Sequence, residues 1–408
     1  MNTGDSVFVW ISTLLVFLMI PGLAFFYAGL VRKKNILSVL MACFATLAIV
    51  SLQWVLFGYS LAFDPAEFIH GFLGGFHWVG LSGVLHTPFP GYSATIPHSS
   101  YMMFQMMFAV ITPALIIGAV VERMKFSALC VFILAWSFLV YDPIAHWVWG
   151  MGGWLRQLGA LDFAGGTVVH ISAGISALAV VLILGKRKEL ATAHPCNLPM
   201  VVLGAGLLWL GWFGFNAGSA LAMSDIAMQA FLTTHSAAAA ATLSYLLLEW
   251  GFQKRPTILG AVTGAIAGLV AVTPAAGFVS IFAAIFVGAV ASLVAYFMIT
   301  VVKKKLGYDD ALDVFGVHGM CGIWGALATG IFASTQINPG GAEGLLYGNL
   351  GLFKAQVIAV IVSVGYSFCV TFVLIKVIDA IMGIRVTEQE EYQGLDLSLH
   401  HEIAYKLD

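Results

Sequence analysis

Long apolar runs, separated by short polar segments, follow one another along almost the whole chain. Many are about 20 residues long, the length that an α-helix needs to cross the hydrocarbon of a bilayer. The pattern therefore indicates an all-α integral membrane protein that lies in a lipid bilayer. We predict eleven transmembrane helices, at residues 7–31, 36–62, 99–121, 126–145, 163–185, 199–221, 226–251, 257–274, 277–302, 312–334 and 353–380.

The composition supports this interpretation. Of the 408 residues, 60% are apolar and 9% are charged, whereas a soluble protein carries about 25% charged residues. The formal net charge of −2 argues against a nucleic-acid partner. The five cysteines are scattered singly, which favours packed small side chains over a disulfide framework or a metal site, and we expect no cofactor.

The basic residues predict the orientation. Residues 1–6 contain an acid and no base, so the first run is a permanent span rather than a signal peptide. Positive clusters follow spans one, three, five, seven and nine, and the single residues Lys376, Arg385 and Lys406 close or follow span eleven. Only Arg156 and Lys354 of the 18 lysines and arginines lie on the other side. By the positive-inside rule, the amino terminus is outside and the carboxyl terminus inside. We expect a multi-pass protein of the plasma or inner membrane.

The predicted domain organisation is simple. Residues 1–380 form the transmembrane domain, and residues 381–408 form a short cytoplasmic tail. Residues 63–98 contain too many glycines and prolines for a span. We expect the four histidines of that segment to be solvated, namely His70, His77, His86 and His98.

Two stretches in opposite halves of the chain share a pattern. In each stretch an Asp is followed eight residues later by a His that has a Val directly before it. The stretches are Asp162 to His170 and Asp310 to His318. Phe26-Tyr27-Ala28-Gly29 similarly resembles Phe215-Asn216-Ala217-Gly218. Five spans is an odd number, so the two halves run in opposite directions, as in transporters with a site at the midplane. The predicted inverted repeats cover about residues 7–185 and 199–334.

The depth of the two histidines follows from helix geometry. Eight helical residues rise about 12 Å, so His170 and His318 approach the middle of a core about 30 Å thick from opposite faces. They could be unrelated histidines, each bonded to a local carbonyl. Their symmetry favours a pair that shares one N–H···N bond and turns its other nitrogens to a pore. Asp162 and Asp310 are expected to cap helix starts rather than to contact substrate.

Longer motifs resemble a known family from end to end. The chain is similar to the ammonium transporter family, the Amt/Mep/Rh group, and looks most like its bacterial AmtB-type channels. The motifs are I-P-G-L-A-F-F-Y-A-G-L-V-R-K-K-N from Ile20, F-Q-M-M-F-A-V-I-T from Phe104, G-A-V-V-E-R-M-K-F from Gly118, P-I-A-H-W-V-W-G from Pro143, D-F-A-G-G-T-V-V-H from Asp162, N-L-P-M-V from Asn197, G-W-F-G-F-N-A-G-S from Gly211, D-V-F-G-V-H-G-M-C-G from Asp313 and Y-Q-G-L-D-L-S-L-H-H-E in the tail.

The resemblance implies a homotrimer with one pore in each subunit. It also implies a PII-type signal-transduction protein that docks on the cytoplasmic face. Within the pore it assigns an outer recruitment site for ammonium, a gate of two stacked phenylalanines beneath that site, a pair of pore histidines and a tryptophan that packs beside the pore. These positions are Phe108, Trp149 and Ser219 for recruitment, Phe104 and Phe215 for the gate, His170 and His318 for the pair, and Trp212.

The residue types agree with selective ammonium transport. Aromatic faces attract a cation and a hydroxyl accepts its hydrogen bond. Ammonium can then lose a proton and pass the histidines as ammonia, whereas potassium cannot. Two other functions stay open, a pore for water, carbon dioxide or a neutral amine, and an ammonium sensor that signals through the tail. Whether transport carries net charge is also open.

An enzyme is the least favoured class. The acids Glu122, Glu249 and Asp142 lie at or near span ends and are not clustered with a nucleophile. We interpret them as structural charges at helix ends. The sequence suggests no role for His235.

Overall fold

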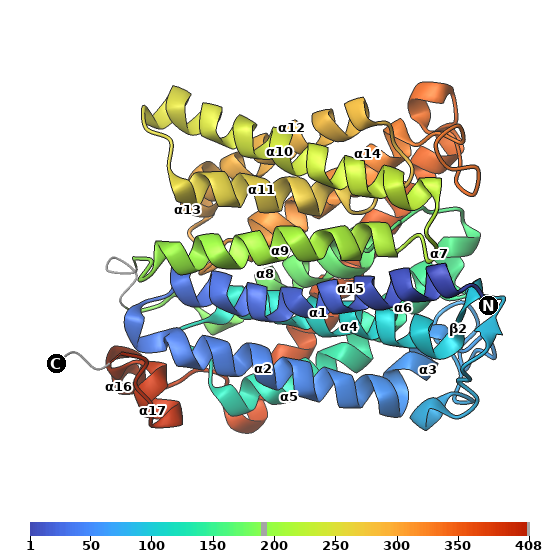
Figure 1. Cartoon of the computed structure of the whole chain (residues 1–408). Coiled ribbons are helices and arrows are strands. Elements are labelled where there is room, and N and C mark those ends of the chain that lie inside the picture. The colour runs from blue at the N-terminus through green and yellow to red at the C-terminus, as the bar shows by residue number, and fades with distance from the viewer. Residues whose placement is uncertain (189–193, 406–408) are drawn as a thin grey trace.

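The computed structural model describes residues 1–188 and 194–405, which form a bundle of long helices lying side by side (Figure 1). In these ranges ten helical runs are long and apolar enough to cross a membrane, and each overlaps a predicted span. A shorter apolar helix, Ile258–Val272, lies at the eighth predicted span. The prediction of an all-α integral membrane protein is confirmed.

The bounds of the elements are as follows. The α-helices are α1 (Thr3–Leu30), α2 (Ile36–Gln53), α3 (Tyr59–Phe63), α4 (His98–Val120), α5 (Phe126–Trp136), α6 (Asp142–Trp149), α7 (Trp154–Gln157), α8 (Ser172–Leu184), α9 (Leu198–Gly218), α10 (Asp225–Gln253), α11 (Ile258–Val272), α12 (Ile281–Phe297), α13 (Lys303–Leu306), α14 (Cys321–Phe332), α15 (Leu350–Met382), α16 (Glu388–Gln393) and α17 (Leu395–His400). Short 3₁₀ turns are η1 (Lys33–Asn35), η3 (Val79–Leu81) and η9 (Leu345–Tyr347).

Several spans contain a π-helical turn, either between two α-helices or at the start of the span, in which each hydrogen bond reaches one residue further along the chain. Because an α-helix continues directly from each turn, these spans cross the bundle without a loop. In the described part of the chain, these turns are η2 (Trp54–Gly58), η4 (Ser137–Tyr141), η5 (Gly166–Ile171), η7 (Met298–Val302) and η8 (Phe315–Met320).

Helices α1 and α9, the first of each predicted repeat, pack closely against one another (Figure 1). Their backbones nearly touch, because a Cβ atom at Gly204 of α9 would lie 2.3 Å from the Phe26 nitrogen of α1. A glycine at this crossing therefore allows close helix approach, as is usual in membranes. Gly22 lies against Leu208 and Gly214 against Ser12, so the two helices run antiparallel, as the inverted repeat predicts.

The two ends of the bundle differ. The end with the amino terminus also holds the short antiparallel hairpin of β1 (Pro88–Phe89) and β2 (Ser93–Pro97), in which Pro88 pairs with Pro97 and Phe89 with Ser93 (Figure 1). We call it the hairpin end. The opposite end holds α16 and α17, and we call it the tail end.

The hairpin end shows one wrong prediction. His70, His77 and His86 are exposed, but His98 is only 3% exposed and begins α4. Its Nε2 lies 2.6 Å from the hydroxyl of Tyr59, and its ring packs on Trp78 with a centroid distance of 4.5 Å. The His98 Nε2 thus has a hydrogen-bond partner, and the aromatic rings around it exclude water. The spacing of the histidines along the chain gave no sign of this burial.

The tail folds back onto the bundle. The Leu395 N–H donates to Asn35 Oδ1 at 2.8 Å, and the Ser38 N–H donates to Asp396 Oδ1 at 2.7 Å. These bonds fasten α17 to η1 and the start of α2. The tail-end loops also carry Arg32 and Arg187, two of the basic residues that the sequence assigns to the inner side. Lys406, which the sequence assigns to the same side, lies outside the described residues.

Candidate functional site

Two π-helical turns bring the predicted pore histidines together at the centre of the bundle. His170 lies in η5 and His318 in η8, and they are 2% and 5% exposed. Their Nδ1 atoms are 3.3 Å apart, and the rings stack with centroids 5.3 Å apart. The backbones also meet, because a Cβ atom at Gly174 would lie 2.1 Å from the Gly319 nitrogen. A side chain at Gly174 would therefore push α8 away from η8.

The carboxylate of Asp162 binds the start of η5. Its Oδ1 accepts from the N–H groups of Gly165 and Gly166 at 2.8 and 2.7 Å, and its Oδ2 accepts from Thr167 and Val168 at 2.7 and 3.2 Å. These are N–H groups at a helix start, which have no partner within the helix. The carboxylate thus holds the turn that carries His170.

Asp310 occupies the matching place before η8. Its Oδ2 accepts from the Phe315 N–H at 2.7 Å. Asp313, one turn nearer the histidine, instead pairs with Lys303, with its Oδ1 2.6 Å from the Lys303 Nζ. Of these two acids, Asp310 therefore makes the contact that resembles that of Asp162.

A pocket of about 190 Å³ opens at the hairpin end. Phe108, Trp149 and Ser219 line it together, as the resemblance implies. The rings of Phe108 and Trp149 meet edge to face, with centroids 5.8 Å apart. We call this cavity the hairpin-end pocket.

Hydrogen bonds fix two of these groups. The Ser219 hydroxyl donates to the Phe215 carbonyl at 2.8 Å, and the Trp149 Nε1–H donates to the Asp162 carbonyl at 3.0 Å. The only proton of the serine hydroxyl is therefore committed, so its oxygen is left as an acceptor.

The phenylalanines expected to form a gate make different ring contacts from those predicted. Phe215 lies against Phe108, with centroids 4.3 Å apart and planes at 37°, whereas Phe104 meets Phe108 edge to face at 5.0 Å. The ring that lies against Phe215 is thus that of Phe108, where the prediction placed Phe104, and a gate at this pair stays a prediction. Phe104 and Phe108 lie on neighbouring turns of α4, and helical spacing alone could not decide which ring reaches α9.

A narrow cavity of about 20 Å³ lies beneath this phenylalanine pair. Phe215, Trp212, His170 and His318 are among its lining residues. Trp212 stacks on His170 with centroids 5.4 Å apart, and its Nε1–H donates to the Thr273 hydroxyl at 2.9 Å. Trp212 thus packs beside the histidine pair.

A wider pocket of about 310 Å³ follows at the tail end, and His318 lines both it and the narrow cavity. Phe108 and Phe215 similarly lie between the hairpin-end pocket and the narrow cavity. The three cavities therefore lie in a row along a candidate path through the bundle, and the smallest of them lies beside the histidines.

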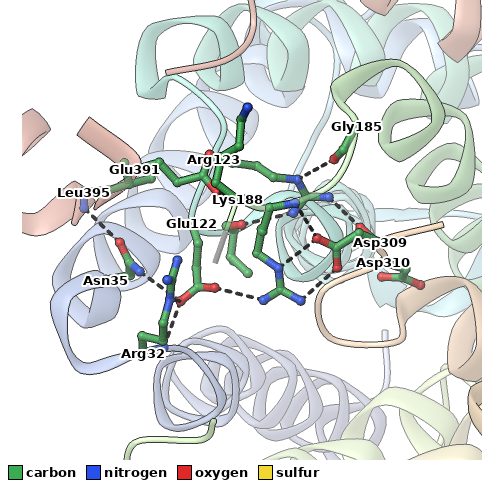
Figure 2. Close-up of polar contacts among 12 residues, drawn as sticks. Arg32, Asn35, Glu122, Arg123, Gly185, Lys188, Asp309, Asp310, Glu391 and Leu395 are labelled. Carbon is green, nitrogen blue, oxygen red and sulfur yellow. Dashed lines mark hydrogen bonds and ion pairs between the residues drawn. The ribbon is translucent and has the colours of Figure 1, made fainter. Parts of the chain in front are cut away.

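Three buried charged side chains, Arg32, Glu122 and Arg187, line the tail-end pocket, and Figure 2 shows the polar contacts around Glu122. Glu122 Oε1 accepts from the N–H and the Nε of Arg32, each at 2.9 Å, and its Oε2 accepts from Arg187 Nη1 at 2.9 Å. Arg187 also reaches Asp309 with two nitrogens, at 2.9 and 2.8 Å. We call Arg32, Glu122, Arg187 and Asp309 the tail-end ion cluster.

The charges of this cluster determine the pKa values of its acids. Burial raises the pKa of Glu122, but the positive charges of Arg187 and Arg32 outweigh it, and the pKa is lowered. Burial likewise raises the pKa of Asp309, and hydrogen bonds and charge from Arg187, with the charge of Arg123, lower it overall. Both acids are thus held as carboxylates at neutral pH.

Sequence reasoning did not identify all residues around the path. Gln105 and Tyr101 of α4 line the hairpin-end pocket beside Phe108, and so does Arg156. The spacing of Tyr101, Gln105 and Phe108 places them on one face of a helix, and this signal could have identified the first two. Residues 1–188 and 194–405 contain no group of three or more His, Cys, Asp or Glu side chains that could hold a metal ion.

Comparison with known proteins places the chain in a family. The profile of the Ammonium Transporter Family matches residues 7–405. An ammonium transporter of Bacillus subtilis is 54% identical over 406 residues, which cover 100% of this chain and 99% of the relative. Ammonium transporter Amt1 of Archaeoglobus fulgidus is 46% identical over 408 residues, with 99% and 100% of the two chains covered.

Solved structures agree with this match. Candida albicans Mep2 has a TM-score of 0.89 at 35% identity and covers 96% of this chain and 88% of its own. A sensor Amt protein has a TM-score of 0.88 at 28% identity, covering 97% of this chain and 98% of its own. Family profile, relatives and fold thus lead to one conclusion: the chain is a multi-pass membrane protein that belongs to the ammonium transporter family, a family of transporters rather than enzymes.

Proposed function

We propose that this protein transports ammonium by binding it at the hairpin-end pocket, removing a proton, and conducting ammonia past His170 and His318. The observation that carries the proposal is the narrow cavity of about 20 Å³ beside the histidine pair, between two much wider pockets. Such a passage suits a small neutral molecule. The positive-inside pattern supports a hairpin end that faces outward and a tail end in the cytoplasm of a plasma or inner membrane.

Recruitment follows from the groups that line the hairpin-end pocket. The faces of Phe108 and Trp149 attract a cation, for about 0.5–2 kcal/mol each. The Ser219 oxygen accepts a hydrogen bond, since its own proton is donated to the Phe215 carbonyl. Ammonium donates hydrogen bonds and potassium cannot, so the serine favours ammonium.

Selectivity follows from the cost of a charge in the narrow cavity. A charged group at the centre of a bilayer costs from about 3 to more than 10 kcal/mol. Ammonium removes most of this cost by losing a proton, and then passes as ammonia. Potassium keeps its charge and is excluded.

The histidine pair offers both kinds of hydrogen-bonding group. In a neutral pair, one ring donates through Nδ1 and keeps a lone pair on Nε2, and the other accepts at Nδ1 and carries its proton on Nε2. His170 Nε2 is buried and has no hydrogen-bond partner within the described part of the chain. This nitrogen is therefore available to a molecule in the path.

The test replaces each histidine. His170→Ala and His318→Ala proteins, reconstituted in liposomes, are expected to lose ammonium flux or the exclusion of potassium. The exposed His86→Ala protein is the control and should behave as the parent. Unchanged flux and unchanged potassium exclusion in both pore variants would contradict the histidine mechanism. Current measured together with flux decides whether transport carries net charge.

The exposure of His235 supports an oligomer, and the family resemblance suggests three copies. This histidine lies eleven residues into the 29-residue helix α10, is exposed on the surface of the bundle, and sits 5.6 Å from the ring of Trp209. A polar ring in contact with lipid is costly, which favours a second copy of the chain on this face. Mass measurement of the detergent-purified protein tests the number of copies, and a single copy would refute this part.

A PII-type partner is proposed for the tail end. Purified protein should bind PII proteins of the same organism in some nucleotide condition, and failure in all conditions would exclude them. The likeness to a sensor Amt protein keeps sensing as a second candidate. Ammonium flux in liposomes distinguishes the two, since a sensor without transport would show none.

A further inference from the structure

The turn between α9 and α10 shapes one side of the hairpin-end pocket. Ser219 and Leu221 of this turn both line that pocket. Leu221 has a φ of 59°, in the left-handed region that residues other than glycine seldom adopt. Such a conformation persists only where surrounding contacts hold it in place.

The chain's amino-terminal end supplies one such contact. Asp5 lies in the first turn of α1, where it is only 7% exposed. Its Oδ1 accepts a hydrogen bond of 3.0 Å from the Met223 N–H, two residues beyond Leu221. The bond joins segments 218 residues apart in the sequence.

Other bonds fix Asp5 itself. The Asn2 side chain accepts from the Asp5 N–H at 3.2 Å, and the Asn2 N–H donates to the Thr95 carbonyl of β2 at 2.6 Å. The Trp10 indole N–H donates to the Ser100 hydroxyl of α4 at 2.7 Å. The start of α1 is thus anchored to the hairpin and to α4, so its carboxylate is a fixed point for the turn.

We propose that Asp5 is a positioning residue for ammonium recruitment: its hydrogen bond to the Met223 N–H holds the turn that presents Ser219 to the hairpin-end pocket. This inference rests on the proposed recruitment role of Ser219. The ordinary role of a first-turn acid is to complement the helix dipole. That role affects the stability of α1 and does not act on the turn.

Two substitutions separate hydrogen bonding from charge. Asp5→Ala removes the acceptor and the charge, whereas Asp5→Asn removes the charge and keeps an oxygen that can accept from Met223. In liposome flux assays, Asp5→Ala is expected to raise the half-saturating ammonium concentration at least about threefold with little change in maximal flux, equivalent to about 0.7 kcal/mol. Asp5→Asn should restore a value near that of the parent protein.

Asp225 provides the matched control. It is an exposed acid in the first turn of α10, at the same end of the bundle. Asp225→Ala should leave half-saturation unchanged, because it removes a first-turn charge without the bond to the turn. A rise equal to that of Asp5→Ala would overturn the proposal, as would an Asp5→Asn protein as impaired as the alanine variant.

The double variant connects Asp5 to Ser219. Two residues that act through the same structure have a combined effect smaller than the sum of their separate effects. The half-saturating concentration of the Asp5→Ala/Ser219→Ala protein should therefore lie close to that of Ser219→Ala alone. Full additivity would refute positioning through Ser219. If Ser219→Ala raises half-saturation but Asp5→Ala does not, the present inference fails and the recruitment site stands. If Ser219→Ala has no effect, the recruitment role itself fails, and with it the inference.

Folding is checked for every variant by its thermal midpoint and its elution in size-exclusion chromatography. Should Asp5→Ala prove unstable, Asp5→Ser takes its place, because its hydroxyl is one carbon shorter and cannot reach the Met223 N–H. The expected rise in half-saturation and the outcomes that overturn it are the same.

Discussion

Replacing Glu122 with glutamine tests how strongly the tail-end ion cluster stabilises the fold. The Glu122 side chain is 0% exposed, and it accepts from two groups of Arg32, from Asn35 and from Arg187 at 2.9 Å each. Glutamine has the same shape but only one acceptor oxygen. Its amide NH₂ must therefore face either Arg187 or the donors of Arg32 and Asn35. Both arginines also lose a negative partner.

The expected loss is large because the charges are buried. Breaking a buried ion pair by removing one partner costs about 3–5 kcal/mol. The matched control is Glu388→Gln in the tail, where the carboxylate lies 3.5 Å from Lys188 Nζ and its side chain is 56% exposed. An exposed pair contributes about 0–1 kcal/mol. The two substitutions make the same chemical change in opposite environments.

Unfolding of the detergent-purified proteins, followed by SDS titration and by thermal midpoint, provides the measurement. Glu122→Gln should unfold at a clearly lower SDS fraction and temperature than the parent, and Glu388→Gln should be nearly unchanged. Equal shifts in the two variants would refute the claim that the buried cluster stabilises this end of the bundle.

Three further predictions concern the stability of the protein in acid, the contact of Asp162 with η5, and the phenylalanines of the hairpin-end pocket. The folded-state pKa values of Glu122 and Asp309 are lowered, so these carboxylates stabilise the fold above their unfolded-state pKa values of about 4 and lose this effect as pH falls through their folded-state pKa values. The SDS midpoint should therefore drop below about pH 4.5, and it should drop less steeply in Glu122→Gln. Asp162→Asn should cost about 2–3 kcal/mol and lower ammonium flux, since one oxygen cannot accept from four N–H groups; parent-like midpoint and flux would contradict this. Phe108→Ala should raise half-saturation about twofold to thirtyfold and Phe104→Ala less, and the reverse order in flux assays would restore Phe104 as the gate.

Much of the fold could be predicted because its signals are local or repeated. Apolar length alone located the spans, and the repeated Asp-to-His stretch located His170 and His318. The basic loops predicted which span ends share one side of the membrane. In agreement, Arg32 and Arg187 lie at the same end of the bundle. These properties depend on residue type and spacing, which are visible without coordinates.

The rest depends on how helices rotate and pack. Phe104 and Phe108 are equally aromatic and lie one turn apart, so only the packing of α4 against α9 shows which ring meets Phe215. Glu122 pairs with Arg187 at a sequence separation of 65 residues, and Arg187 pairs with Asp309 at a separation of 122, with no motif that connects them. His98 was misread because its partner, Tyr59, belongs to a different helix.

The π-helical turns at the two histidines have a consequence for engineering and alignment. A π turn contains one residue more than an α turn of the same extent, so every later side chain in α8 and α14 is rotated by about 100° relative to an uninterrupted helix. Deleting one residue from η5 would shorten the chain by the least possible amount and yet turn a whole face of α8 away from its neighbours. At these two positions the number of residues, and not only their chemistry, determines which side chains surround the histidine pair.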